Sequence, residues 1–240
     1  MLGFASCAWL GEPKTLNETR VLDLNGITKL EVLGIAGNFS VTRGGTAGML
    51  VHGVGRVAVS SERDGSTFRV ASSGDTNCYP CTVDIDIVVP EPLELVLKAS
   101  NGNVNVTNAA TKATLESGNG KISVDGVNDL NAKTANGEIY VTNLKGRAAL
   151  SSDNGKITLE RAVLPAASQN SVRTGNGDIR LNNVGTEGGF VISGNTGTPG
   201  FQLSGFDLKT ATNTFTATRA GQNPTTLSLE TGNGSIQVNP

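Results

Sequence analysis

The 240-residue sequence has few of the residues on which several classes of protein depend. Aromatic residues make up 4% of the chain and charged residues 17%, with a formal net charge of −2. This balance argues against a nucleic-acid partner, because binding to phosphates needs a basic face. No apolar run approaches the roughly 20 residues of a membrane-spanning helix, and no long block of like charge indicates a disordered tail.

Cysteine is also scarce, with Cys7, Cys78 and Cys81 only. The stretch "CYPC" has the C-x-x-C spacing of redox and zinc sites. A zinc site needs two further ligands, and the chain has a single histidine, His52. A redox motif belongs at a helix N-terminus, which lowers the thiol pKa, whereas Pro80 leads into the strand pattern "CTVDIDIVVP". We therefore predict a Cys78–Cys81 disulfide that clamps a loop in an oxidising compartment.

The N-terminal stretch "MLGFASCAWLGEP" lacks the basic region and the long apolar core of a signal peptide. Its "FASC" resembles the end of a bacterial lipoprotein signal, although Phe4 stands where leucine is usual. We interpret Met1 as lying inside a longer precursor and Cys7 as a lipidation site. The alternative is an ordinary free cysteine in an irregular terminus.

Glycine is abundant, at 31 residues, and much of it lies in a repeated Asn-Gly turn. The turns begin at Asn101, Asn119, Asn136, Asn154, Asn176 and Asn233, with spacings of 18, 17, 18, 22 and 57. A period near 18 indicates a solenoid, and a spacing of 57 corresponds to three periods. A degenerate turn, "SGNTG" at Asn195, lies inside the long gap.

Apolar residues recur at fixed offsets from each turn. Four residues before the asparagine stand Leu97, Leu115, Ala132, Leu150, Val172 and Leu229; three after it stand Val104, Ile122, Ile139, Ile157, Ile179 and Ile236. The residues between them are polar, and this alternation predicts strands with one buried face. Two short strands meet at each turn, and like columns stack on like columns. The pattern predicts a parallel β-solenoid with coils of about 18 residues. We expect asparagine and glycine at the corner because both tolerate positive φ.

The outward columns carry alternating charges. One contains Asn103, Lys121, Glu138, Lys156 and Asp178, and another contains Lys98, Glu116, Lys133, Ser151 and Arg173. In-register strands about 4.8 Å apart favour opposite charges in neighbouring coils. We therefore interpret these columns as structural ladders and not as a binding patch. Two lysines in the first column would also repel calcium, the ion that a related glycine-rich repeat binds.

Outside the regular coils the pattern is weaker. Residues 30–41 fit the same template, and residues 57–70 predict a hairpin around Asp64-Gly65. The stretch "KTATNTFTATRAGQNPTT" is expected to loop out before a last coil that has no obvious cap. We divide the chain into a signal or anchor with linker at 1–19 and a solenoid domain at 20–240. Within that domain, coils are irregular at 20–92, regular at 93–194 and irregular again at 195–240.

Three blocks in this order carry a family resemblance: "LEVLGIAGNFSV", "VDIDIVVPEPLELVLKASNGNVNV" and the repeated "(S/T)GNG(D/K)I". The chain resembles the bacterial DUF4097 family, which overlaps the DUF2807 head domains called putative adhesins. The resemblance covers roughly residues 20 to 240. It implies a right-handed all-β solenoid on an envelope protein, often behind a signal peptide or lipid anchor, and it carries over no catalytic residues.

Enzyme chemistry has little support in the sequence. Polysaccharide-acting β-helix enzymes need an acid/base pair or a metal in a groove. Asp84 and Asp86 alternate with apolar residues and so indicate the exposed face of a strand. Glu160 stands next to Arg161, and His52 lies in a strand pattern. We predict no catalytic residues, no metal and no cofactor.

The predicted function is that of a non-enzymatic cell-envelope protein, an adhesin or binding scaffold. It would be exported to the periplasm, outer membrane or cell surface, attached through a Cys7 lipid, with a cell-surface protein or glycan as partner. The alternatives are a self-assembling structural solenoid, since an uncapped end is a template for further strands, and a polysaccharide-acting enzyme. Phe201, Phe206 and Phe215 are the candidate binding residues, because they lie in the irregular region; filling a widened coil is the alternative.

Overall fold

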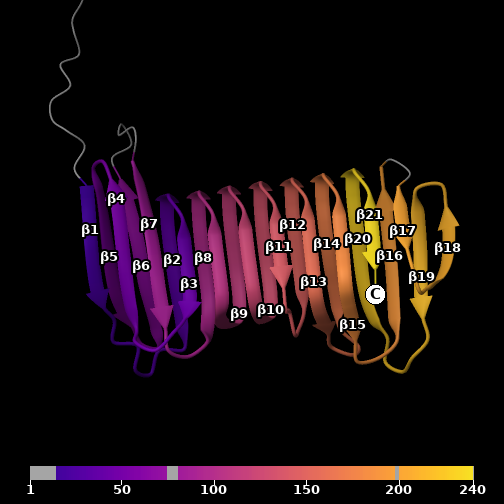
Figure 1. Cartoon of the computed structure of the whole chain (residues 1–240), viewed down its shortest axis with the longest axis horizontal. Helices are drawn as coiled ribbons and strands as arrows, with labels where there is room; N and C mark the ends of the chain where they lie inside the picture. Colours follow the sequence, from indigo (N-terminus) through magenta and orange to yellow (C-terminus); the bar gives the residue numbers. More distant parts are fainter. Residues whose placement is uncertain (1–14, 75–80, 198–199, 240) are drawn as a thin grey trace, which may run out of the picture.

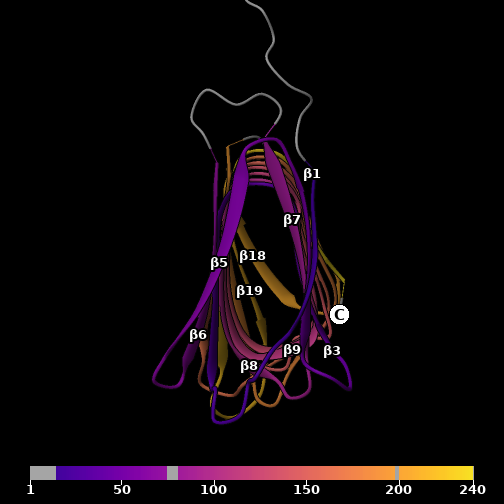
Figure 2. The ribbon, with the colours of Figure 1, turned by 90° about the vertical axis from the view of Figure 1, so that its left-hand side faces the viewer.

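The computed structural model describes residues 15–74, 81–197 and 200–239, which form 21 β-strands and no helix. Figure 1 shows the strands stacked side by side along a rod. Figure 2 looks along this rod from its N-terminal end and shows that the strands form two facing layers. The predicted all-β solenoid is therefore confirmed.

Each regular coil contributes one strand to each layer, and like columns stack as expected. In one layer Leu115 pairs with Ala132, which pairs with Leu150. In the other layer Ile139 lies between Ile122 and Ile157. All these side chains are at most 1% exposed, so both inner faces share one aliphatic core.

Layer 1 contains, in spatial order, β5 (Val57–Asp64), β6 (Thr67–Gly74), β2 (Lys29–Ala36), β8 (Leu93–Asn101), β9 (Val104–Asn119), β10 (Ile122–Asn136), β12 (Ala148–Asn154), β14 (Gln169–Asn176), β20 (Thr225–Asn233), β16 (Phe190–Thr196), β19 (Thr214–Arg219) and β18 (Asp207–Ala211). Layer 2 contains β1 (Thr15–Val21), β4 (Gly48–Val54), β7 (Thr82–Val89), β3 (Phe39–Arg43), β9, β10, β11 (Ile139–Thr142), β13 (Ile157–Leu164), β15 (Ile179–Thr186), β21 (Ile236–Asn239) and β17 (Phe201–Leu203). The long strands β9 and β10 bend and contribute to both layers.

The order of the coils along the rod differs from their order in the sequence. We expected the spacing of 57 before Asn233 to hold three consecutive periods. Instead, β20 pairs directly with β14, and β21 pairs directly with β15. The segment between them lies further out, because β16 and β17 pair with the opposite edges of β20 and β21. The last coil is thus inserted between two earlier ones.

The N-terminal end has the same kind of insertion. The strands β2 and β3 form a coil from residues 29–43, and this coil lies between two later segments. β2 pairs with β6 on one side and with β8 on the other. β3 correspondingly lies between β7 and β9. After β2 and β3, the chain therefore runs toward the N-terminal end of the rod and forms β4 to β7 there. It then passes to the other side of the first coil, where the regular coils begin with β8 and β9.

Antiparallel strands complete both ends of the rod. The predicted hairpin around Asp64-Gly65 is confirmed as β5 and β6. The segment expected to loop out is instead the antiparallel hairpin of β18 and β19, because its alternating Thr214–Arg219 stretch pairs with β16. The expectation of an uncapped last coil was wrong for the same reason, since β16 to β19 lie beyond that coil.

The edges at the two ends carry features that discourage further strand pairing. β17 is only three residues long, and every residue of β18 is exposed. On β1, Arg20 forms an ion pair with Glu18 and donates a hydrogen bond to the Val59 carbonyl oxygen in the opposite layer at 3.1 Å. Short edges and charges that close the end of a sheet oppose edge-to-edge association. These features weaken the case for self-assembly.

Glycine at the Asn-Gly corner is explained mainly by close stacking, and the positive φ that we expected occurs there at Gly102 and Gly177, with values of 150° and 152°. A Cβ atom on Gly120 would collide with the Gly102 carbonyl group of the neighbouring coil. Gly137 lies in the same way against Gly120. Beneath the corner, buried hydroxyls donate to these carbonyl oxygens, as Thr134 Oγ1 does to Gly120 at 3.1 Å. The position after each turn asparagine thus needs a residue without a side chain.

A second corner, which the sequence did not lead us to expect, lies in five coils at the point where the chain leaves layer 2. Asn108, Gly126, Asn143, Arg161 and Asn183 occupy it, and all have φ between 52° and 70°. Glycine and asparagine adopt this left-handed conformation more easily than other residues. The signal was present, because one of these two residue types stands seven positions after most turn asparagines.

Candidate binding surface

The three phenylalanines of the predicted binding surface lie at the C-terminal end of the core. Phe215 is 3% exposed, and Phe201 and Phe206 are half-buried against the core. The Phe201 and Phe215 ring centroids are 5.0 Å apart, and Phe206 contacts Phe190 edge-on at 5.9 Å. The Phe215 ring lies directly against Gly194 and occupies the space that a side chain at position 194 would need. These rings therefore fill the end of the core, which was our alternative interpretation.

The cysteine predictions fall mostly outside the described residues. This holds for Cys7, with its lipidation, and for Cys78. Cys81 immediately precedes β7, and its Sγ lies 3.8 Å from the Arg56 carbonyl oxygen. The Cys78–Cys81 disulfide and the Cys7 lipid remain predictions.

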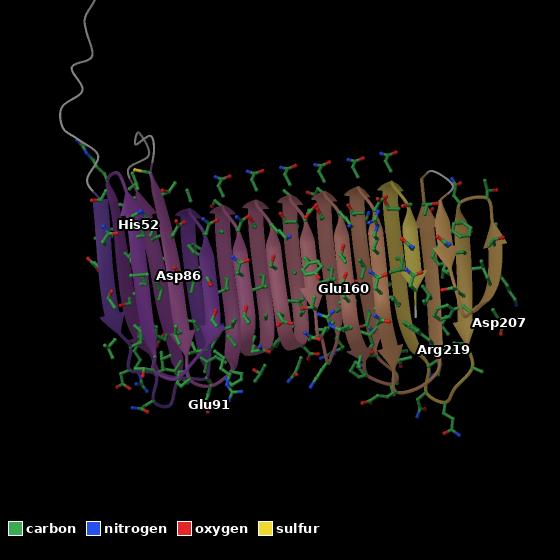
Figure 3. All side chains as sticks on the ribbon, viewed as in Figure 1. His52, Asp86, Glu91, Glu160, Asp207 and Arg219 are labelled. Atoms are coloured by element: carbon green, nitrogen blue, oxygen red, sulfur yellow. The ribbon has the colours of Figure 1, made fainter. Side chains whose placement is uncertain are left out.

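The titratable residues considered for catalysis lie in two separate places. His52 pairs directly with Asp84 on the neighbouring strands β4 and β7, Asp86 also lies on β7, and Glu160 lies several coils away on β13. Figure 3 shows His52 and Asp86 near the N-terminal end, Glu160 in the middle and Asp207 at the other end. His52 Nδ1 lies 2.6 Å from Asn17 Oδ1, and Glu160 accepts a hydrogen bond from the Tyr140 hydroxyl at 3.0 Å. That bond raises the pKa of Tyr140 above its ordinary value. Glu160 therefore shares no site with His52, Asp84 and Asp86.

Two kinds of feature are absent from the described part of the chain, residues 15–74, 81–197 and 200–239. No three His, Cys, Asp or Glu side chains in it gather closely enough to hold a metal ion. It also contains no helix with the length and apolar character needed to cross a membrane.

The alternating charges on the outer faces form ion pairs between coils, as predicted. On layer 1, Lys98 Nζ lies 3.2 Å from Glu116, and Arg173 lies 3.4 Å from Glu230. On layer 2, Lys121 lies 3.8 Å from Glu138. These side chains are roughly half exposed, so each pair contributes about 1 kcal/mol or less. A cation paired in this way attracts an anionic ligand less strongly than an unpaired cation does.

A ladder of asparagine amides runs along the corner beside layer 1. The Asn119 amide donates to Asn101 Oδ1 at 2.6 Å, and Asn136 donates to Asn119 at 2.8 Å. The series continues through Asn154 and Asn176 to Asn233, at 2.7–2.9 Å. Each amide between the two ends of the ladder uses one donor and one acceptor within it and keeps further hydrogen-bonding capacity toward solvent.

The outer face of layer 1 is hollowed by three cavities of about 650, 290 and 270 Å³. The largest reaches Lys133 on β10, and the other two share Asn131 and Ala149. We call this surface the layer 1 groove; its characteristic exposed or half-buried residues are Lys98, Asn131, Lys133, Ala149, Ser151 and Arg173. It extends over several neighbouring coils and is the candidate binding surface.

The charge ladder of layer 1 is interrupted inside this groove. Ser151 pairs with Lys133 on one side and with Arg173 on the other. If positive and negative side chains alternated along the whole column, a carboxylate would stand at position 151, but the Ser151 hydroxyl is uncharged. Among the described residues, Lys133 forms no ion pair, whereas Arg173 turns to Glu230. Sequence reasoning placed Ser151 in the charged column but drew nothing from its missing charge.

Comparisons with known proteins give only distant likenesses. No family model matches the chain, and no curated protein gives a significant match. A putative adhesin from Bacteroides fragilis is 14% identical, with 93% of this chain and 96% of that chain covered and a TM-score of 0.47. For a putative cell adhesion protein from Clostridium sporogenes the identity is 14%, the coverages are 95% and 99%, and the TM-score is 0.41. Likenesses of this strength carry no functional argument.

Proposed function

We propose that the protein is a non-enzymatic binding scaffold of the bacterial cell envelope and that the layer 1 groove contacts its partner. The observation that carries this proposal is the groove itself, which extends over several coils of a rigid rod. Ladder hydrogen bonds join the strands that carry it, so its polar side chains keep a fixed spacing. A pre-organised surface loses little conformational entropy when it binds a partner.

The proposed location rests on the sequence. The lipobox-like "FASC" and the Cys78–Cys81 spacing support export to an oxidising compartment. The resemblance to envelope proteins points in the same direction. Attachment through a Cys7 lipid is part of this proposal.

A single bulky substitution tests the binding surface. Ala149 is exposed and lines two of the three cavities, so Ala149→Trp should fill the groove without entering the core. Thr107 is an exposed residue at a comparable strand position of layer 2, and Thr107→Trp is the matched control. Both variants should melt within a few degrees of the wild type, because surface substitutions usually change stability by about 0.5 kcal/mol or less.

The assay is sedimentation of purified protein with isolated bacterial envelopes. We expect Ala149→Trp to reduce the bound fraction several-fold and Thr107→Trp to leave it unchanged. Equal binding by the two variants would show that the groove is not the contact surface.

A further inference from the structure

The charge ladder of layer 1 is interrupted at Ser151, so its two neighbouring cations, Lys133 and Arg173, have no carboxylate between them. Neighbouring strands are about 4.8 Å apart, so Lys133 and Arg173 stand about 10 Å apart with the uncharged Ser151 between them. Elsewhere on the same face, Glu116 occupies the equivalent position between Lys98 and Lys133. A carboxylate from outside, placed over Ser151, would complete the alternation.

The surroundings of Ser151 favour a sugar over a peptide as the carrier of that carboxylate. The adjoining cavity is lined by short polar side chains, among them Asn131, Ser171 and Ser228, and by the ion pair of Arg173 with Glu230. Amide and hydroxyl groups can donate to and accept from sugar hydroxyls. The exposed apolar residue there is Ala149, which offers no pocket for a large peptide side chain.

Strand addition, the common way of binding an extended peptide, is blocked at this place. The strand β12, which carries Ser151, is already paired with β10 on one side and with β14 on the other. Its backbone donors and acceptors therefore belong to the sheet. A ligand over Ser151 must bind through side chains.

The shape of the groove favours a chain over a single sugar. Two of its cavities follow one another over successive coils: the first reaches from Lys98 to Lys133, and the second reaches from Asn131 to Ser228. We propose that the layer 1 groove binds an acidic linear polysaccharide and that one carboxylate of this chain lies over Ser151, between Lys133 and Arg173. This inference rests on the proposed function and names its ligand class.

The test measures binding of three probes to the full chain by calorimetry. A short β-1,4-linked oligomannuronate carries the carboxylates, and the matching β-1,4-mannan oligosaccharide has the same backbone without them. A polyglutamate peptide supplies the same charge on a different carrier. We expect the oligomannuronate to bind and the other two to bind at least tenfold more weakly. Equal binding of the neutral chain, or preference for polyglutamate, would overturn the inference.

Ser151→Glu is the decisive variant, because it supplies the missing carboxylate from within the protein. It should raise the melting temperature by pairing with Lys133 and Arg173, and it should weaken oligomannuronate binding at least tenfold. Ser123→Glu adds the same charge to layer 2 and should leave binding within twofold. Lys133→Ala should cost about fivefold, equivalent to about 1 kcal/mol. Unchanged binding by a stably folded Ser151→Glu protein would contradict the inference.

The same variants separate this inference from the proposed function. If Ala149→Trp abolishes envelope binding while Ser151→Glu preserves it, the groove is a binding surface but its ligand is not the acidic chain. If Ala149→Trp preserves envelope binding, the groove is not the contact surface.

Discussion

Cysteines at Arg173 and Glu230 test the insertion of the last coil. The two residues pair directly on the outer face of layer 1, although they are as far apart in the chain as Asn176 and Asn233, which are separated by 57 residues. Adjacent strands place their Cα atoms about 4.8 Å apart, within the range of about 4.4–6.8 Å that a disulfide accepts. With the native cysteines replaced by serine, we expect Arg173→Cys/Glu230→Cys to oxidise readily to one cross-linked monomer.

The expected size of the effect follows from the closed loop. Closing a loop of that length removes chain entropy worth about 4 kcal/mol from the unfolded state. For a chain of this size, each kcal/mol shifts the melting temperature by roughly 2–4 °C, so the oxidised form should melt roughly 10 °C above the reduced form. Non-reducing gels and peptide mass spectrometry identify the cross-link, and thermal denaturation measures its effect.

A second pair distinguishes the inserted order from sequential stacking. We expected Asn195 at a turn, but it lies within β16 in the same column as Glu230 and Arg173, so stacking in sequence order would place it beside Arg173. In the structure, Glu230 lies between them, so Arg173 and Asn195 are about 10 Å apart. This exceeds the limit of about 7 Å, and Arg173→Cys/Asn195→Cys should stay reduced. A cross-link in this pair, with none between positions 173 and 230, would refute the coil order described above.

Three further predictions concern the second corner, the inserted coil and the cysteine pair. Arg161 has a φ of 52° where other coils use asparagine, so Arg161→Asn should stabilise the protein by about 0.5–1 kcal/mol in chemical denaturation, and a loss of stability would argue against strain there. Hydrogen bonds from the Ser235 backbone N–H and hydroxyl lower the pKa of Asp178, so its contribution to stability is present above about pH 4 and lost as pH falls further; Asp178→Asn should flatten this acid dependence, and an unchanged pH profile would contradict the assignment. Protein from the native envelope, denatured without reduction, should show no titratable thiol from Cys78 or Cys81, and two such thiols would rule out the disulfide.

The stacking of equivalent apolar residues in successive coils was predictable because it depends only on the local alternation of apolar and polar residues. Alternation of apolar and polar residues places Ile122, Ile139 and Ile157 on one face whatever their neighbours are. The charged columns followed from the same register, since opposite charges favour adjacent strands. The solenoid and its ladders are therefore properties of the repeat, and the sequence by itself determined them.

The binding surface was only partly predictable. Aromatic residues in an irregular segment suggested Phe201, Phe206 and Phe215, but their burial depends on neighbours that are distant in sequence. Phe215 lies on Gly194, for which no local pattern gives a signal. The layer 1 groove depends on side chains from several coils, so its existence follows only from their packing together.

The order of the coils was decided by the tertiary structure alone. The inner columns hold interchangeable aliphatic residues, so one coil fits against another almost equally well. Val172 pairs with Leu229 as readily as Leu150 pairs with Val172. Loop-closure entropy changes slowly with length and discriminates little between near and distant partners. What distinguishes the ends is the antiparallel strands that complete them, such as β18, whose residues are all exposed and can lie only outside the regular stack.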